Sequence, residues 1–262
     1  MPAAEVGVFG GSGLYDLLDH VEERRVETPY GSPSAPIAIG EVGGRKVAFL
    51  PRHGKRHELP PHRVPYRANV WAMRELGVRR LIGPCASGGL QPGSRPGEFV
   101  VCDQFVDRTS GRADTFHDGP ETTHVSAADP YCADLRRLLV ETARELGIPV
   151  RDGGTVVVIQ GPRFSTRAES SWFGSMGWDV VNMTAYPEGH LARELALCYA
   201  NVSMITDLDV GVEGAKPVSA EAVLEVLRAN DDALRRLLFA VLPKIERQPD
   251  DACANALVGA RV

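Results

Sequence analysis

The chain has 262 residues, of which 44% are hydrophobic and 24% charged, so it can bury a large core and is not a disordered chain. Its net charge of -5 argues against a protein that mainly binds nucleic acid or an anionic membrane, because both partners require a positive field. The lack of a signal peptide or an apolar membrane span, with five scattered cysteines and no CxxC pair, predicts a cytoplasmic protein with reduced thiols and no bound metal.

Short apolar runs rich in β-branched residues alternate with longer segments of helical spacing. The short runs predict strands at residues 6–9, 46–50, 81–83, 99–105, 155–159, 180–183 and 202–206. The longer segments predict helices at residues 66–76, 131–146, 187–198 and 220–242, the last with a break near 229–232. This alternation predicts an α/β fold, a single domain with a mixed, mainly parallel central sheet flanked by helices on both faces. We expect the domain to span residues 1–246 and residues 247–262 to form a loosely ordered tail.

Small and polar residues gather just after the predicted strands, where ligands bind sheets of this class. After the first strand, the segment GGSG at residues 10–13 offers backbone N–H groups and the Ser12 hydroxyl to an anion such as phosphate. An ordinary tight turn explains the segment equally well. It matches neither the dinucleotide-binding pattern GxGxxG nor the P-loop pattern, so it does not support a dinucleotide or nucleoside-triphosphate site.

Basic side chains follow the second strand in the segment RHGKRH at residues 52–57. The Arg52 guanidinium suits bidentate binding of phosphate, and the His53 imidazole lies beside it in the sequence. The alternatives are a solvated basic loop and a nucleic-acid patch. The acidic balance of the chain and the lack of interleaved aromatic residues weaken the nucleic-acid alternative, so we favour a small anion.

The segment CASGGL at residues 85–90 places small residues after a third strand, where the N–H groups near Cys85 and Ala86 can reach a ligand. Cys85 is either a nucleophile or a small buried spacer. A nucleophilic thiolate needs a base and an electropositive setting, neither of which the sequence pattern supplies, so we favour the spacer. No GxSxG pattern occurs, which argues against a Ser-His-Asp hydrolase.

Two aspartates, Asp207 and Asp209, follow the last predicted strand directly after Thr206. Residues two apart in an extended chain point to the same side, so both carboxylates can accept hydrogen bonds from one ligand. Taken alone, the pair is better explained as turn-forming. The neighbouring candidate segments favour a ligand-binding pair instead.

Together, the segments GGSGL, RHGKRH, CASGGL, GPRFSTRAES, VVNMT and TDLD occur in the order and at the spacing of the trimeric purine nucleoside phosphorylase superfamily. The chain resembles this family over nearly its whole length, and within it most closely the 5′-deoxy-5′-methylthioadenosine phosphorylase branch. The resemblance implies phosphorolysis of that nucleoside, or of a related 5′-substituted adenosine, to adenine and 5-methylthioribose 1-phosphate. It also implies that phosphate is a co-substrate, that there is no cofactor, and that the assembly is a homotrimer or a dimer of such trimers.

The resemblance also implies site residues, position by position. Phosphate binding falls to Ser12, Arg52, His53, Cys85, Ala86 and Thr184. Nucleoside binding falls to Phe164, which stacks on the purine, to Asn182, Met183, Thr206, Asp207 and Asp209, to an apolar 5′ wall of Val218, Ala220, Val223 and Leu224, and to His124 from a neighbouring subunit. Asp207 and Asp209 are the catalytic candidates, with Asp207 delivering a proton to purine N7. The chain departs from many family members at Cys85, where Thr is frequent, and at Ala220 and His190.

The residue type at position 207 bears on the choice of base. An ionised carboxylate only accepts hydrogen bonds, which suits the amine of adenine, whereas Asn would suit a 6-oxopurine. Asp207 therefore favours a 6-aminopurine. The alternatives are a phosphorylase of 6-oxopurine nucleosides or methylthioinosine, a nucleosidase that uses water, and a nucleoside-binding protein without catalysis. The anion site argues against the nucleosidase, and Cys85 in place of Thr favours the non-catalytic protein.

Overall fold

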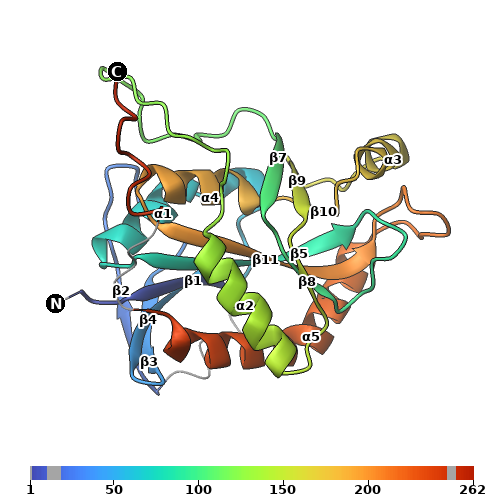
Figure 1. The fold of residues 1–262 in the computed structure, drawn as a ribbon, viewed down its shortest axis with the longest axis horizontal. Coiled ribbons are helices and arrows are strands. Elements are labelled where there is room, and N and C mark those ends of the chain that lie inside the picture. The colour runs from blue at the N-terminus through green and yellow to red at the C-terminus, as the bar shows by residue number, and fades with distance from the viewer. Residues whose placement is uncertain (1, 11–18, 247–251) are drawn as a thin grey trace.

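Strands and helices alternate along the chain and build one large sheet with helices on both sides (Figure 1). The computed structural model describes residues 2–10, 19–246 and 252–262. Its strands are β1 Val6–Gly10, β2 Asp19–Arg24, β3 Ile37–Val42, β4 Arg45–Pro51, β5 Arg80–Gly89, β6 Phe99–Val101, β7 Gln104–Arg108, β8 Val150–Asp152, β9 Thr155–Ile159, β10 Val180–Asn182 and β11 Cys198–Leu208. Its α-helices are α1 Tyr66–Glu75, α2 Ala133–Glu145, α3 Arg167–Ser175, α4 Ala185–Glu194 and α5 Ala220–Val241.

The strand β5 lies at the centre of this sheet. It pairs in parallel with β11 along its whole length and with β1 at residues 80–82, and antiparallel with β10 at residues 88–89. Among the described residues, six strand pairings are parallel and four are antiparallel. The predicted α/β fold with a mixed, mainly parallel sheet and helices on both faces is therefore confirmed.

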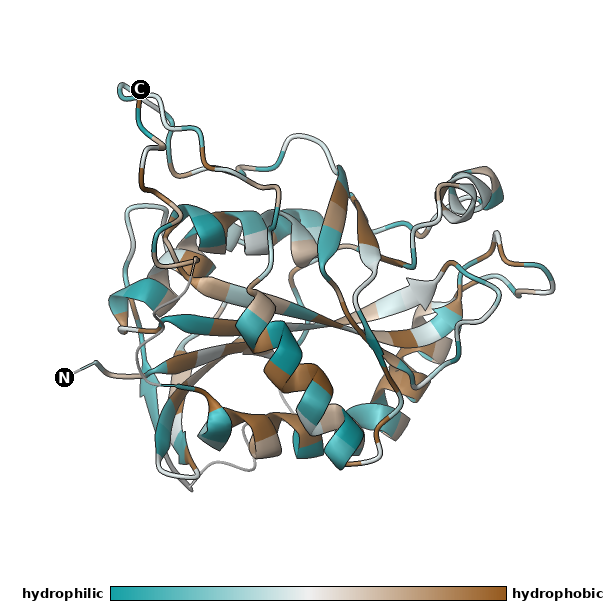
Figure 2. Cartoon of the chain, viewed as in Figure 1, coloured by the Kyte–Doolittle hydropathy of each residue, from teal (hydrophilic) through white to brown (hydrophobic). Residues whose placement is uncertain are grey.

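Two hydrophobic layers, one on each face, hold the helices to the sheet. On one face α2 and α5 bury Leu135, Leu139 and Leu237 against the strands. On the other, α1 and α4 bury Met73 and Leu191. Figure 2 shows the same arrangement in colour, with brown hydrophobic stretches in the central strands and alternating brown and teal around the helices. Burial of these apolar side chains supplies the main driving force for folding.

The central strands are longer than the sequence predicts. The strand expected at residues 81–83 continues to Gly89, and the one expected at 202–206 begins at Cys198 and ends at Leu208. The helix expected at 187–198 ends at Glu194, because Ala196 adopts a left-handed backbone with φ 54° and the chain then enters β11. Both strands contain small residues that contribute little to the apolar pattern used to predict strands. The sequence therefore underestimates the length of both strands.

Two further predictions are wrong. The strand expected at residues 99–105 divides into β6 and β7, because the chain turns at Cys102 and Asp103 to pair with different neighbours. The helix α5 continues through residues 229–232 without a break. Asn230 does not end it, because its side-chain amide donates a hydrogen bond to the Val226 carbonyl one turn earlier, at 2.9 Å. The strands β2, β3 and β8 and the helix α3 were not predicted.

Residues 252–262 of the predicted tail run beside the loop that follows β7. Cys253 is buried in the same core as α2 and α5, and Arg261 forms a β-bridge with Thr123. The His124 amide donates a hydrogen bond to the Ala260 carbonyl at 2.8 Å. The domain boundary at residue 246 and the looseness of the whole tail stay predictions. None of the helices in the described parts of the chain has both the length and the apolar character needed to cross a bilayer.

The continuity of α5 makes a proline at its exposed centre costly. We expect Ala229→Pro to lower the free energy of unfolding by about 3 kcal/mol or more, because proline removes a helical hydrogen bond and clashes with the preceding turn. Ala229→Gly, the control, should lower it by only about 1 kcal/mol. Urea denaturation measures both values, and equal small losses for the two variants would mean that the helix is broken there after all.

Candidate functional site

The predicted site residues gather along the second half of β5. Arg52 donates a hydrogen bond to the Pro84 carbonyl at 3.0 Å, the Thr184 hydroxyl lies 3.2 Å from the Cys85 sulfur, and Thr206 donates to the Ser87 carbonyl at 3.3 Å. In the paired strand β11, Asp207 is the partner of Gly88. A strand rises about 3.3 Å per residue, so Pro84 to Gly88 spans about 13 Å. One strand therefore places a basic end and an acidic end within the length of a nucleoside and a phosphate.

The basic end is built on a buried ion pair between Arg52 and Glu188. Arg52 Nε and Nη2 donate to the two Glu188 carboxylate oxygens at 2.6 and 2.7 Å, and the Tyr199 hydroxyl donates to Glu188 at 2.7 Å. Burial acts to lower the pKa of the Arg52 guanidinium, but the charge and hydrogen bonds of Glu188 hold it above its ordinary value. With Nη1 also bound to Pro84, each of the two Nη atoms keeps one further hydrogen for an anion. The sequence interpretation missed Glu188, because its partner lies far away in the chain.

The His53 ring has a defined tautomer. Its Nδ1 lies 2.8 Å from the Leu59 carbonyl oxygen, which can only accept, so Nδ1 carries the proton and donates it. Desolvation, and then the Arg52 charge, lower the pKa of His53 to about 4, so the ring is neutral at neutral pH. Its Nε2 is then an acceptor. His53 therefore suits the hydroxyl of a hydrogen phosphate, and it is not the second cationic donor that its position beside Arg52 suggests.

Cys85 and Thr184 meet at the start of α4. The Asn182 side-chain oxygen accepts hydrogen bonds from the backbone N–H groups of Thr184 and Ala185, at 3.3 and 3.2 Å, and so shapes the turn into the helix. The Asn182 amide is therefore engaged in positioning Thr184. Burial raises the pKa of the Cys85 thiol. A thiol that stays protonated is a poor nucleophile, which supports the interpretation of Cys85 as a spacer.

The acidic end has two carboxylate oxygens that await a partner. Within the described residues, Asp207 Oδ1 and Asp209 Oδ2 are buried and accept no hydrogen bond. The other Asp207 oxygen lies 2.8 Å from the Thr206 hydroxyl oxygen and shares its single hydrogen with the Ser87 carbonyl. Desolvation, together with the charge of Asp209, raises the pKa of Asp207 to about 6. Leaving buried polar atoms without partners costs free energy, which makes these two oxygens the candidates to meet polar groups of a ligand.

The remaining candidates lie around this strand on more exposed segments. Phe164, 36% exposed, lies on the loop between β9 and α3. The proposed 5′ wall surrounds the start of α5, where Val218 and Val223 are half-buried and Ala220 and Leu224 are exposed. His124 is exposed on the loop that contacts residues 252–262. Ser12 lies outside the described residues.

The Met183 carbonyl, at the end of β10, is already held by the protein. The Arg112 guanidinium donates to it at 2.9 Å, and also to the Tyr186 and Gln160 carbonyls. Arg112 was not among the predicted residues, since it precedes no strand and belongs to no motif. A surface pocket lined by residues 62–68 and 111–113 with Tyr30 includes Arg112 but none of the predicted ligand-binding residues.

Comparison with known proteins shows the family to which this chain belongs. The model of the phosphorylase superfamily matches residues 5–243. The chain belongs to this superfamily. Among superfamily members, the S-methyl-5′-thioadenosine phosphorylase of Pyrococcus abyssi is 51% identical, with 97% of both chains covered. The purine nucleoside phosphorylase of Streptomyces coelicolor is 53% identical, covering 98% of this chain and 95% of the relative. The structure of methylthioadenosine phosphorylase from Schistosoma mansoni in complex with adenine superposes with a TM-score of 0.92 at 37% identity, with 98% of both chains covered.

The raised pKa of Asp207 in this phosphorylase superfamily member links its stability to pH. Folding raises this pKa from 3.8 to about 6, so Asp207 costs the folded chain least below about pH 4 and most above about pH 6. We expect Asp207→Asn to raise the free energy of unfolding by roughly 1–3 kcal/mol near neutral pH and by much less near pH 4. Urea denaturation at both pH values tests this, with the exposed Asp232→Asn as the matched control. A gain that does not depend on pH would contradict it.

Removing the carboxylate of Glu188 should leave the Arg52 charge buried without its counterion. We expect Glu188→Gln to lower the free energy of unfolding by about 3 kcal/mol. The control is Glu23→Gln, whose ion pair with Lys55 is exposed and should contribute less than about 1 kcal/mol. If the two substitutions lowered the free energy of unfolding equally, the buried ion pair would contribute no more to stability than the exposed one.

Proposed function

We propose that this chain catalyses the phosphorolysis of 5′-deoxy-5′-methylthioadenosine, or of a related 5′-substituted adenosine, to adenine and 5-methylthioribose 1-phosphate. The observation that carries the proposal is the pair of carboxylate oxygens on Asp207 and Asp209 that have no partner among the described residues, one strand segment away from the buried Arg52. The names of the relatives support it, since both S-methyl-5′-thioadenosine and purine nucleoside phosphorylases match over nearly the whole chain.

The chemistry follows from charge. Breaking the bond between ribose and purine develops positive charge on the sugar and negative charge on the base, and a site that stabilises both lowers the barrier. Phosphate held by Arg52, by the Thr184 hydroxyl and through a hydrogen bond to His53 Nε2 would attack C1′ and stabilise the sugar cation. We propose Ser12 and the N–H groups near Cys85 and Ala86 as further phosphate ligands. No cofactor takes part in this scheme.

The purine end supplies the proton. A carboxyl with a pKa of about 6 holds its proton in a useful fraction of molecules near neutral pH, which suits a general acid. Asp207 would deliver this proton to purine N7, and Asp209 would accept a hydrogen bond from the exocyclic amine. Phe164 would stack on the ring, with Asn182, Met183 and Thr206 shaping the ribose and base contacts.

The exposed residues complete the proposal. The wall of Val218, Ala220, Val223 and Leu224 would hold an apolar 5′ group, and exposure of such residues in a single chain suits a surface that a ligand and a neighbouring subunit cover. We propose a homotrimer, or a dimer of trimers, in which His124 reaches the neighbouring site. The cytoplasm is the proposed location, because a reducing compartment keeps buried cysteines as thiols.

An assay of four nucleosides under phosphate tests the function. Methylthioadenosine, adenosine, methylthioinosine and inosine are compared side by side by kcat/KM, with and without phosphate. We expect phosphate-dependent cleavage with methylthioadenosine preferred over the other three. Preference for the 6-oxopurines would favour a phosphorylase of 6-oxopurine nucleosides or methylthioinosine. Activity without phosphate would identify a nucleosidase, and binding without turnover would identify a non-catalytic protein.

The base preference should depend on Asp207. We expect Asp207→Asn to reduce the ratio of kcat/KM for methylthioadenosine over methylthioinosine at least tenfold, because the amide can donate to O6 and no longer supplies the acid. The exposed Asp232→Asn variant should leave the ratio unchanged. A ratio that stays constant in Asp207→Asn would remove this account of base choice.

A further inference from the structure

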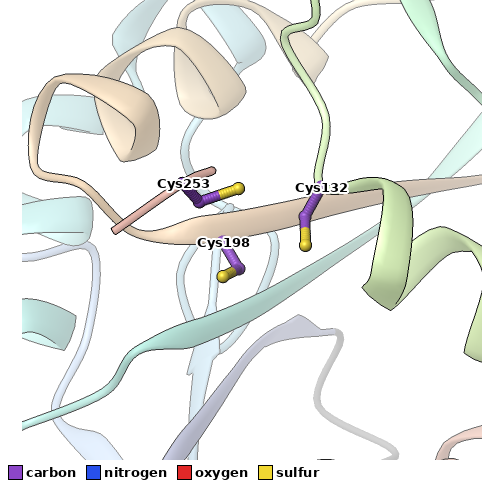
Figure 3. A group of neighbouring side chains, drawn as sticks. All are labelled: Cys132, Cys198 and Cys253. Carbon is purple, nitrogen blue, oxygen red and sulfur yellow. The ribbon is translucent and has the colours of Figure 1, made fainter. Parts of the chain in front are cut away.

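Three buried cysteines meet near the start of β5 and β11, whereas the candidate site lies along the second half of β5. The sulfur atoms of Cys132, Cys198 and Cys253 all lie within 4.8 Å of one another (Figure 3). Cys132 immediately precedes α2, Cys198 is the first residue of β11, and Cys253 belongs to the C-terminal segment. Their exposed fractions are 2%, 1% and 7%. Their separations of 66 and 55 positions along the chain have no motif character, and the prediction of scattered cysteines without a shared site therefore missed the cluster.

The surroundings of the cluster are electropositive. Arg80 Nη1 lies 3.5 Å from the Cys132 sulfur and 3.4 Å from the Cys198 sulfur. Cys132 also occupies the N-cap position of α2, where the helix dipole places partial positive charge. Both features stabilise a thiolate over a thiol, and the thiolate is the form that binds metals.

We propose that Cys132, Cys198 and Cys253 form a buried three-sulfur site for a soft, thiol-binding metal ion, of which Cu(I) is the best match. Soft thiolate ligands select Cu(I) and zinc, but structural zinc sites take four ligands and the cluster offers three sulfurs. Its burial leaves little room for water as a fourth ligand. Arg80 offsets part of the negative charge that the thiolates keep after binding a monovalent ion.

The geometry requires only a small adjustment. A planar three-coordinate ion with metal–sulfur bonds of about 2.3 Å needs its sulfurs about 4 Å apart, so the sulfurs would move inward by less than about 1 Å. Binding would displace the thiol protons to solvent and would involve no change of oxidation state at sulfur. Cys253 is the most exposed of the three, so the ion would enter from the C-terminal segment.

Occupation of the site would tie three distant parts of the chain together. The C-terminal segment would be joined through Cys253 to the first turn of α2 and to the central strand β11. The same segment accepts a hydrogen bond from His124 at Ala260. This proposal is independent of the proposed catalytic function, because Cys132, Cys198 and Cys253 are not among the residues assigned to phosphate or purine binding.

The test is a Cu(I) titration of the reduced full-length protein without oxygen, in competition with a chromophoric Cu(I) chelator. We expect one tightly bound equivalent, ultraviolet sulfur-to-copper charge-transfer absorption, and an X-ray absorption spectrum with three sulfur neighbours at about 2.3 Å. Each of Cys132→Ser, Cys198→Ser and Cys253→Ser should weaken binding at least tenfold. The matched control is Cys102→Ser, a buried cysteine outside the cluster, which should retain the full affinity.

The spectra of the unsubstituted protein keep the proposal testable if a variant fails to fold. Copper with fewer than three sulfur neighbours would overturn it, as would affinity that survives all three cluster substitutions. Formation of a disulfide among the three cysteines, with no copper retained under reducing conditions, would overturn it as well. Cys253 is the most exposed of the three cysteines, so we expect Cys253→Ser to disturb folding least. The Cu(I) affinity of this variant is therefore the most direct test of the site.

Discussion

The ion pair between Arg52 and Glu188 is the interaction on which the candidate site depends. It joins the end of β4 to α4, and the Tyr199 hydroxyl adds β11 to the same network. Moving both charges out of water is costly, and their attraction offsets that cost only when geometry and hydrogen bonds are complete, as they are here. The pair therefore contributes less to net stability than to orientation. It fixes the plane of the guanidinium, so that its two remaining hydrogens point along one direction rather than many.

At the acidic end of the site, two buried carboxylate oxygens lack hydrogen-bond partners within the described residues. Glu188 accepts hydrogen bonds from Arg52, but no group in the described chain donates a hydrogen bond to Asp207 Oδ1 or Asp209 Oδ2. Burial raises the pKa of Asp207 because the charged carboxylate loses its water. The same loss of water makes it costly in free energy to bury Asp207 and Asp209 as anions. A ligand that accepts the Asp207 proton and donates a hydrogen bond to Asp209 would relieve both costs at once. In the proposed scheme, binding of the purine and acid catalysis would therefore share one physical cause, the removal of water from a carboxylate.

Sequence patterns predicted the general fold and several of the residues that converge on β5. They brought together Arg52, Cys85, Thr184 and Asp207, whose binding roles stay predictions, although Cys85 and Asp207 lie inside β5 and β11 and not after a strand end. They failed at Glu188 and at the cysteine cluster, because ion pairs and sulfur contacts between residues more than fifty positions apart leave no local periodicity. The lengths of β5 and β11 were underestimated for a related reason, since glycine, serine and alanine carry no apolar signal. The neutral state of His53 also needed the structure, because it depends on the Leu59 carbonyl and on burial.

Because the candidate site is laid out along β5, the regular geometry of this strand sets the distance between its basic and acidic ends. Side chains alternate between the two faces of a strand, so inserting or deleting one residue in β5 would turn every later side chain to the wrong face. The separation between the basic and acidic ends can therefore not drift by small steps as the sequence changes. The start of α5 obeys no such rule, because its exposed residues are attached to a helix and a loop. The start of α5 can accordingly change residue by residue without altering the separation between the basic and acidic ends.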